Sequence, residues 1–162
     1  MISSLWSTKF LNACSILVWD PHRVNLRPSI ADMLRPSMRT LKHIVVNINV
    51  SGGNDPLFGI PSEFEYMCSK NIIETITIRI IFRTYSQRGD NWSRLDKVLT
   101  TPGWFSLKRV SLVIDISIFY RENELVIALR NFAETQFPRL SSSNTVSFDF
   151  EVIPYIELTL LE

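Results

Sequence analysis

The chain has 162 residues, of which 46% are apolar and 20% charged, enough for one domain with a hydrophobic core. Its net charge is +1, from 17 basic and 16 acidic residues, and this balance argues against nucleic acid or an anionic membrane as a partner. Uninterrupted apolar runs such as 16–19 are far shorter than the ~20 residues of a spanning helix, so we expect no membrane crossing. Two cysteines are too few for a disulfide framework and no signal peptide is recognisable, so we expect an intracellular location, cytoplasmic or nuclear.

The first half of the chain offers two short helices after an N-terminal segment, 1–28, that we interpret as a cap or a remnant. Ser29, with Asp32 three residues later, predicts the N-cap of a helix that Pro36 stops. Ser62 and Glu65 have the spacing of a capping box, which predicts that a second helix begins at Ser62.

The second half offers two further helices. The first is predicted over 92–99, where apolar residues fall on one helical face before 101–103 ends the helix. The second is predicted to begin at a cap formed by Asn123, to carry Phe132 on its apolar face, and to stop before Pro138. The closing segment, 154–162, is interpreted as a C-terminal cap.

Between these helices, an apolar anchor followed by alternating apolar positions recurs four times. The copies are Leu41-x-x-Ile44-x-Val46-x-Ile48-x-Val50, Ile73-x-x-Ile76-x-Ile78-x-Ile80, Leu107-x-x-Val110-x-Leu112-x-Ile114-x-Ile116, and Leu140 followed by Val146-x-Phe148-x-Phe150-x-Val152. Each copy predicts one strand. Aligned at Ile44, Ile76, Val110 and Val146, they are separated by 32, 34 and 36 residues, a period typical of leucine-rich and related repeats.

Strands that alternate with helices and short loops predict an α/β fold with a parallel sheet. A doubly wound sheet carries helices on both faces and has strands that are apolar throughout, whereas a horseshoe solenoid carries helices on one face and has alternating strands. The alternation here favours a leucine-rich-repeat-like horseshoe solenoid. We therefore expect one repeat domain over 1–162, with units near 29–56, 57–90, 91–121 and 122–153.

The sequence resembles the leucine-rich-repeat-like region of mushroom-type fungal proteins that carry F-box domains. The segments that carry the resemblance are 34–44, 92–96, 102–110 and 137–140, and their pattern is a Trp92-x-x-Leu95-Asp96 helix, Trp104 near a turn, and a Leu107-x-x-Val110-x-Leu112 strand. The resemblance implies repeats that select substrates for a cullin-based ubiquitin ligase, docked through an F-box. No F-box is recognisable in 1–28, which places binding to the ligase adaptor in doubt.

The function expected from the sequence is non-catalytic protein binding, through the strand positions that face away from the helices. The alternation places six candidate contact residues there: Asn47, Asn49, Arg79, Asp115, Asp149 and Glu151. The repeat alignment further predicts that Asp115 and Glu151 are neighbouring carboxylates, which together with Asp149 form an acidic patch for a Lys or Arg of a partner. The alternative is that these are ordinary solvated strand residues.

We expect no enzyme activity, no cofactor and no metal site, because the histidines, cysteines and serines show no catalytic or ligand spacing. Two functions stay open, with an unrecognised enzyme as a remote third. One is substrate recognition for an F-box type ubiquitin ligase. The other is a truncated structural remnant of an expanded fungal family that no longer docks to a ligase.

Overall fold

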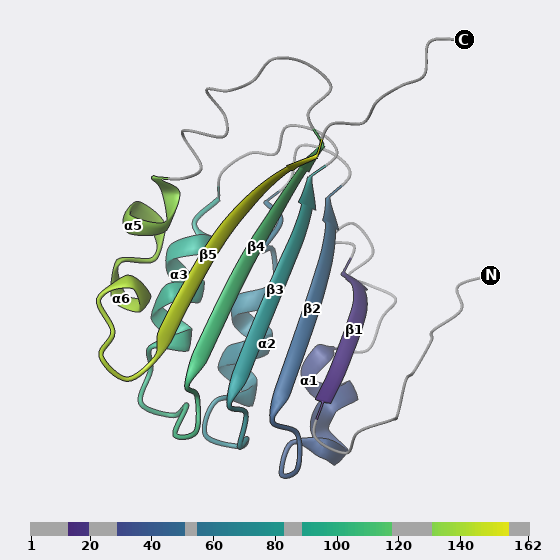
Figure 1. Ribbon diagram of the computed structural model, residues 1–162. Helices are drawn as coiled ribbons and strands as arrows, with labels where there is room; N and C mark the ends of the chain where they lie inside the picture. Colours follow the sequence, from purple (N-terminus) through teal and green to yellow (C-terminus); the bar gives the residue numbers. More distant parts are fainter. Residues whose placement is uncertain (1–12, 20–28, 51–54, 83–88, 118–130, 156–162) are drawn as a thin grey trace, which may run out of the picture.

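The computed structural model describes residues 13–19, 29–50, 55–82, 89–117 and 131–155. Within these residues five strands form one parallel sheet whose order is that of the sequence (Figure 1): β1 (Ala13–Trp19), β2 (His43–Val50), β3 (Thr75–Phe82), β4 (Arg109–Ser117) and β5 (Ser147–Tyr155). The helical elements are α1 (Ile30–Leu34), the 3-10 turn η2 (Arg35–Ser37), α2 (Ile60–Met67), α3 (Asn91–Leu99), α5 (Phe132–Gln136) and α6 (Pro138–Ser141). The prediction of an α/β fold with a parallel sheet is confirmed.

The helices cover one face of the sheet, behind the strands in Figure 1. On this helix face the strand residues are almost fully buried, as Ile44, Ile76 and Ile114 illustrate. Their neighbours along each strand point to the opposite face, which we call the open face. This one-sided burial explains the alternation of apolar and polar residues in the sequence.

Strand β1 adds to the sheet beyond β2, in a segment for which the repeat pattern predicts no strand. It pairs with β2 in parallel, and the register shifts between Leu17 and Trp19. The segment 1–28 therefore contributes a strand to the sheet.

Helix α1 begins and ends as predicted. The side chain of Ser29 accepts a hydrogen bond from the backbone N–H of Asp32 at 2.9 Å.

Helix α2 differs from the prediction, because it begins at Ile60, two residues before the expected cap. Ser62 therefore lies inside the helix, and the capping box is wrong. Gly59 occupies the N-cap with a φ of 81°, a left-handed conformation that glycine adopts without a steric penalty.

Helix α3 matches its predicted span, and its apolar stripe, including Trp92 and Leu95, is buried. The helix expected from Asn123 lies almost entirely outside the described residues. What the structure describes there is α5, which begins at Phe132, and then α6, which begins at Pro138. Because proline fits the first turn of a helix but not its interior, Pro138 separates these two short helices.

Aromatic side chains fill the core at the β5 end of the sheet. Trp92 contacts Phe132 edge to face, with ring centroids 4.7 Å apart, and Phe137 packs on Phe148 at 5.3 Å. Edge-to-face pairs add ~0.5–1.5 kcal/mol beyond the burial of their surface. These contacts join α3, α5, α6 and β5 into one packed layer.

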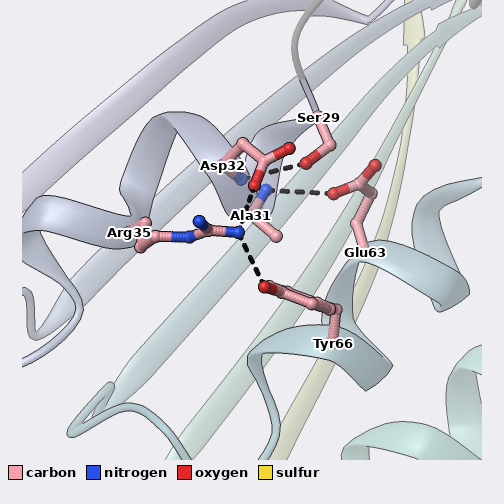
Figure 2. Close-up of polar contacts among 6 residues, drawn as sticks. All are labelled: Ser29, Ala31, Asp32, Arg35, Glu63 and Tyr66. Atoms are coloured by element: carbon pink, nitrogen blue, oxygen red, sulfur yellow. Dashed lines mark hydrogen bonds and ion pairs between the residues drawn. The ribbon is translucent and has the colours of Figure 1, made fainter.

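Neighbouring helices are also tied by polar contacts. Figure 2 shows the carboxylate of Glu63 on α2 accepting a hydrogen bond from the backbone N–H of Ala31 at 3.0 Å. The guanidinium of Arg35 donates to the Tyr66 hydroxyl at 2.7 Å and to Asp32 at 2.6 Å. Glu63 thus satisfies one of the N–H groups that the first turn of α1 leaves unpaired.

The turns that lead from the helices into the strands are stacked closely. The backbone N–H of Ser69 donates to the carbonyl of Gly103 at 2.9 Å, across two neighbouring turns. A Cβ atom on Gly103 would overlap the side chains of Cys68 and Ser69. Within one of these turns, the buried Asn71 donates to the carbonyl of Met67 at 2.8 Å and accepts from an N–H near the start of β3.

Candidate functional site

The candidate site is the open face of the sheet, whose residues form rows across β2, β3, β4 and β5. From the amino ends of the strands toward their carboxyl ends, the rows are Val45, Thr77, Ser111, Asp149; Asn47, Arg79, Val113, Glu151; and Asn49, Ile81, Asp115, Ile153. Neighbouring strands of a sheet stand ~4.8 Å apart. Side chains within one row are therefore close enough to contact a common partner.

All six residues predicted from the sequence lie on the open face, but β5 is displaced by two residues from the predicted alignment. Val110 pairs with Phe148, whereas the repeat alignment matched it to Val146. Val146 lies in the turn before β5 and is nevertheless buried. Because apolar residues alternate with a period of two, a shift of two residues keeps every side chain on its predicted face and changes only its row.

The corrected register removes the predicted pair of carboxylates. Asp115 lies beside Ile153, and Glu151 lies beside Val113. The hypothesis of an acidic patch built from Asp115 and Glu151 as neighbours is therefore wrong.

Two of the three acidic residues of the predicted patch form ion pairs within the sheet. Arg79 pairs with Asp115 on the next strand, and Arg109 pairs with Asp149 at 2.6 Å. In both pairs the arginine reaches two residues beyond the position directly opposite it. The hydrogen bond and charge of Asp115 raise the pKa of Arg79, with a smaller contribution from the charge of Glu151.

Among the described residues, Glu151 has no ion pair, and it is exposed in the central row. Asn47 lies in the same row, separated from Glu151 by β3 and β4, which carry Arg79 and Val113. Asn49, in the next row, has a buried side-chain oxygen, Oδ1, that accepts no hydrogen bond from the part of the chain that the structure describes. The central row thus presents an amide, a paired guanidinium, an aliphatic group and an unpaired carboxylate, in that order.

A further charged cluster lies where the strands begin. Glu74 forms ion pairs with Lys42 and with Lys108, each at 2.8 Å, and the two lysines lower the pKa of Glu74 to about 2. The three residues directly follow the apolar anchors Leu41, Ile73 and Leu107, so their side-by-side placement was readable from the repeat alignment. The candidate site residues named from the sequence did not include them.

Among the described residues, no group of three or more His, Cys, Asp or Glu side chains is arranged to hold a metal ion. In the same residues, no helix is long and apolar enough to cross a membrane. The chemistry available on the open face is that of hydrogen bonding, ion pairing and apolar contact.

Comparison of the chain with protein-family models, with curated proteins and with solved structures gave no match.

Proposed function

We propose that this chain is a non-catalytic repeat domain that binds another protein through the open face of its sheet. The observation that carries the proposal is the central row, Asn47, Arg79, Val113 and Glu151, set on four hydrogen-bonded strands. Because the backbone of the sheet is already ordered, binding here requires the ordering of side chains only, which favours this face as a recognition surface.

The ion pairs on this face favour a partner of mixed polarity. Because Asp115 and Asp149 already have basic neighbours, a cationic partner gains little from them. Glu151, which has no ion pair with the described residues, can accept a Lys or Arg of the partner, and the amide of Asn47 both donates and accepts hydrogen bonds. Val113 between them offers apolar surface, which suits the centre of a protein interface.

The finer architecture that we propose is a leucine-rich-repeat-like horseshoe. It is supported by a strand order that follows the sequence and by helices that cover a single face (Figure 1). Together with the resemblance to fungal F-box proteins, this supports substrate recognition for a ubiquitin ligase as the specific role. The alternative role is that of a structural remnant that no longer docks to a ligase.

A crosslinking experiment tests the use of the open face. A photoreactive phenylalanine analogue is placed at Val113 and, as a control, at the exposed Ser93 on α3. In an extract of the source cells, the probe at Val113 is expected to yield a discrete crosslinked protein that is absent with the probe at Ser93. The same product from both positions, or none from Val113, contradicts the proposal.

A pair of variants tests the contact residues. Replacing Asn47 and Glu151 with Ala is expected to abolish the discrete product, because it removes the polar contacts of the central row. The fold should persist, since neither side chain has an ion pair with the described residues. Replacing the exposed residues Ser62 and Glu134 with Ala is the matched control and is expected to leave the product unchanged. An unchanged product in the open-face variant contradicts the assignment of these contacts.

Co-purification with the adaptor subunit of the ligase separates the two roles. The receptor role predicts a stable complex when the chain is expressed with its native flanking sequence. If no complex forms under these conditions, the receptor role is rejected in favour of the structural remnant.

A further inference from the structure

Three neighbouring turns at the amino ends of the strands form a second surface, which adjoins the open face at Arg109. These turns, 38–43, 68–75 and 100–109, lead into β2, β3 and β4, and we call them together the basic rim (Figure 1). Backbone hydrogen bonds join them directly, from Ile72 to Met38 at 3.4 Å and from Glu74 to Lys42 at 2.7 Å. The rim is therefore one continuous surface.

The basic rim concentrates positive charge that the net charge of the whole chain conceals. It carries one acidic residue, Glu74, and five basic residues: Arg39, Lys42, Lys70, Lys108 and Arg109. The whole chain, by contrast, has a net charge of +1. A balanced composition can still leave one surface strongly charged, and such a surface attracts partners of opposite charge.

Internal contacts compensate this charge only in part. Glu74 is shared by two lysines, and Arg109 pairs with Asp149. Lys70 lies over the ring of Tyr66, with its Nζ 4.2 Å from the ring centroid, and has no ion pair among the described residues. Arg39 is exposed and likewise has no ion pair in the described part of the chain.

Two apolar side chains are exposed on the same rim. Phe105 is 78% exposed and Ile72 is 38% exposed. They lie in the two turns that Glu74 and Lys108 connect, so this surface carries both exposed apolar side chains and cationic groups. Trp104, the neighbour of Phe105, is buried against Phe64 and so anchors this turn to the core.

We propose that the basic rim binds an acidic segment of a partner protein, in which apolar side chains alternate with carboxylates. Its carboxylates pair with Arg39, Lys70 and Lys108, and its apolar groups cover Phe105 and Ile72. The rim offers both kinds of contact, cationic and apolar, that such a segment needs.

The rim is less suited to the continuous charge of a nucleic acid. Helices α2 and α3 end at this edge, at Met67 and Leu99, and their carbonyl ends add negative potential. Glu74 adds a full negative charge between two lysines. A peptide can space its carboxylates to avoid these points, whereas a phosphate backbone cannot.

The test measures binding of a fluorescently labelled peptide of about twelve residues, in which glutamates alternate with leucines. An all-glutamate peptide, a short DNA duplex and phosphatidylserine vesicles serve as competing probes. We expect the mixed peptide to bind the full chain more tightly than any competing probe at low salt, where charge pairs are least screened.

The rim variant replaces Arg39, Lys70 and Lys108 with Gln, one in each turn. It is expected to weaken binding of the mixed peptide about tenfold, since each exposed charge pair contributes a modest amount. The matched control replaces Arg94 and Lys97 on α3 and Arg139 on α6 with Gln, so that its net charge equals that of the rim variant. Binding by the control is expected to stay within about twofold of the original.

The Phe105→Ser variant tests the apolar contribution with a single change on the surface. It is expected to weaken binding of the mixed peptide several-fold and to leave binding of the all-glutamate peptide unchanged. The proposal is overturned if the mixed peptide does not bind at about 1 mM, or if DNA or vesicles bind more tightly. Equal loss of binding in the rim and control variants also overturns it, because binding would then follow net charge alone.

Discussion

The buried carboxylate of Asp96 on α3 accepts a hydrogen bond from the backbone N–H of Leu140 at 2.9 Å. Its second oxygen accepts from the N–H of Arg139 at 3.1 Å. Asp96 thus caps the first turn of α6 from the neighbouring unit, a role similar to that of Glu63 at the start of α1. Both carboxylates hold one helix in place against the next.

Loss of the Asp96 side chain is expected to destabilise the fold. Asp96→Ala leaves two backbone N–H groups at the start of α6 without their acceptor, which costs about 2–3 kcal/mol of unfolding free energy. Asp96→Asn keeps one acceptor oxygen and should cost about half as much. Urea denaturation measures both values.

The matched control for this prediction is Asp90→Ala. Asp90 precedes the same helix, is exposed, and makes no side-chain hydrogen bond to cap it. Its loss should change the unfolding free energy by less than about 0.5 kcal/mol. Equal effects of the two alanine variants would show that the cap on α6 does not stabilise the fold.

The ion pairs of Glu74 predict a pH dependence. Its pKa is about 2 in the folded protein and 4.5 in the reference state, so the folded state favours the ionised form. The resulting stabilisation is fully present above about pH 5 and is lost as the pH falls toward 2. The stability difference between the original chain and Glu74→Gln is expected to shrink over this range, measured by denaturation at a series of pH values.

High salt should reduce the stability difference between the original chain and Glu74→Gln at neutral pH, because the ammonium groups of Lys42 and Lys108 are partly exposed. A difference that stays constant from pH 6 to pH 3 would contradict the assigned cause of the pKa shift.

The two faces of β4 predict opposite responses to a new carboxylate. Leu112 is buried on the helix face, and Val113 lies on the open face between Arg79 and Glu151. Leu112→Asp buries an unpaired charge and is expected to abolish cooperative unfolding. Val113→Asp should change stability by less than about 1 kcal/mol, since its carboxylate lies in solvent beside a guanidinium. Circular dichroism during thermal unfolding distinguishes the two variants, and similar melting curves would refute the one-sided sheet.

The close stacking of turns predicts sensitivity at Gly103. Gly103→Ala places a methyl group against the side chains of Cys68 and Ser69 and is expected to cost about 1–3 kcal/mol. Cys68→Ala removes one of the overlapping atoms. The double variant should therefore lose less stability than the sum of the single variants, as a double-mutant cycle measures. Strict additivity would mean that the two turns are not in contact.

The strands and faces were predictable because alternation is a local property of the sequence. A buried helix face requires an apolar residue at every second position, and β2, β3 and β4 follow this rule throughout. The start of α2 was less predictable, because a Ser and a Glu three residues apart can also lie inside a helix. There the positive φ of Gly59 and the packing of Ile60 fix the first turn.

The sequence by itself determined which side chains face the helices and which face outward, because this depends only on the parity of positions along each strand. Tertiary structure decided which residues are neighbours across strands. The register of β5 depends on how Phe148 and Phe150 pack against the helices, a long-range contact without a local signal. For the same reason, only the fold shows that Arg79 reaches Asp115 on the next strand, and that Arg39 and Lys70 lie in the same basic rim as the lysines at the strand starts.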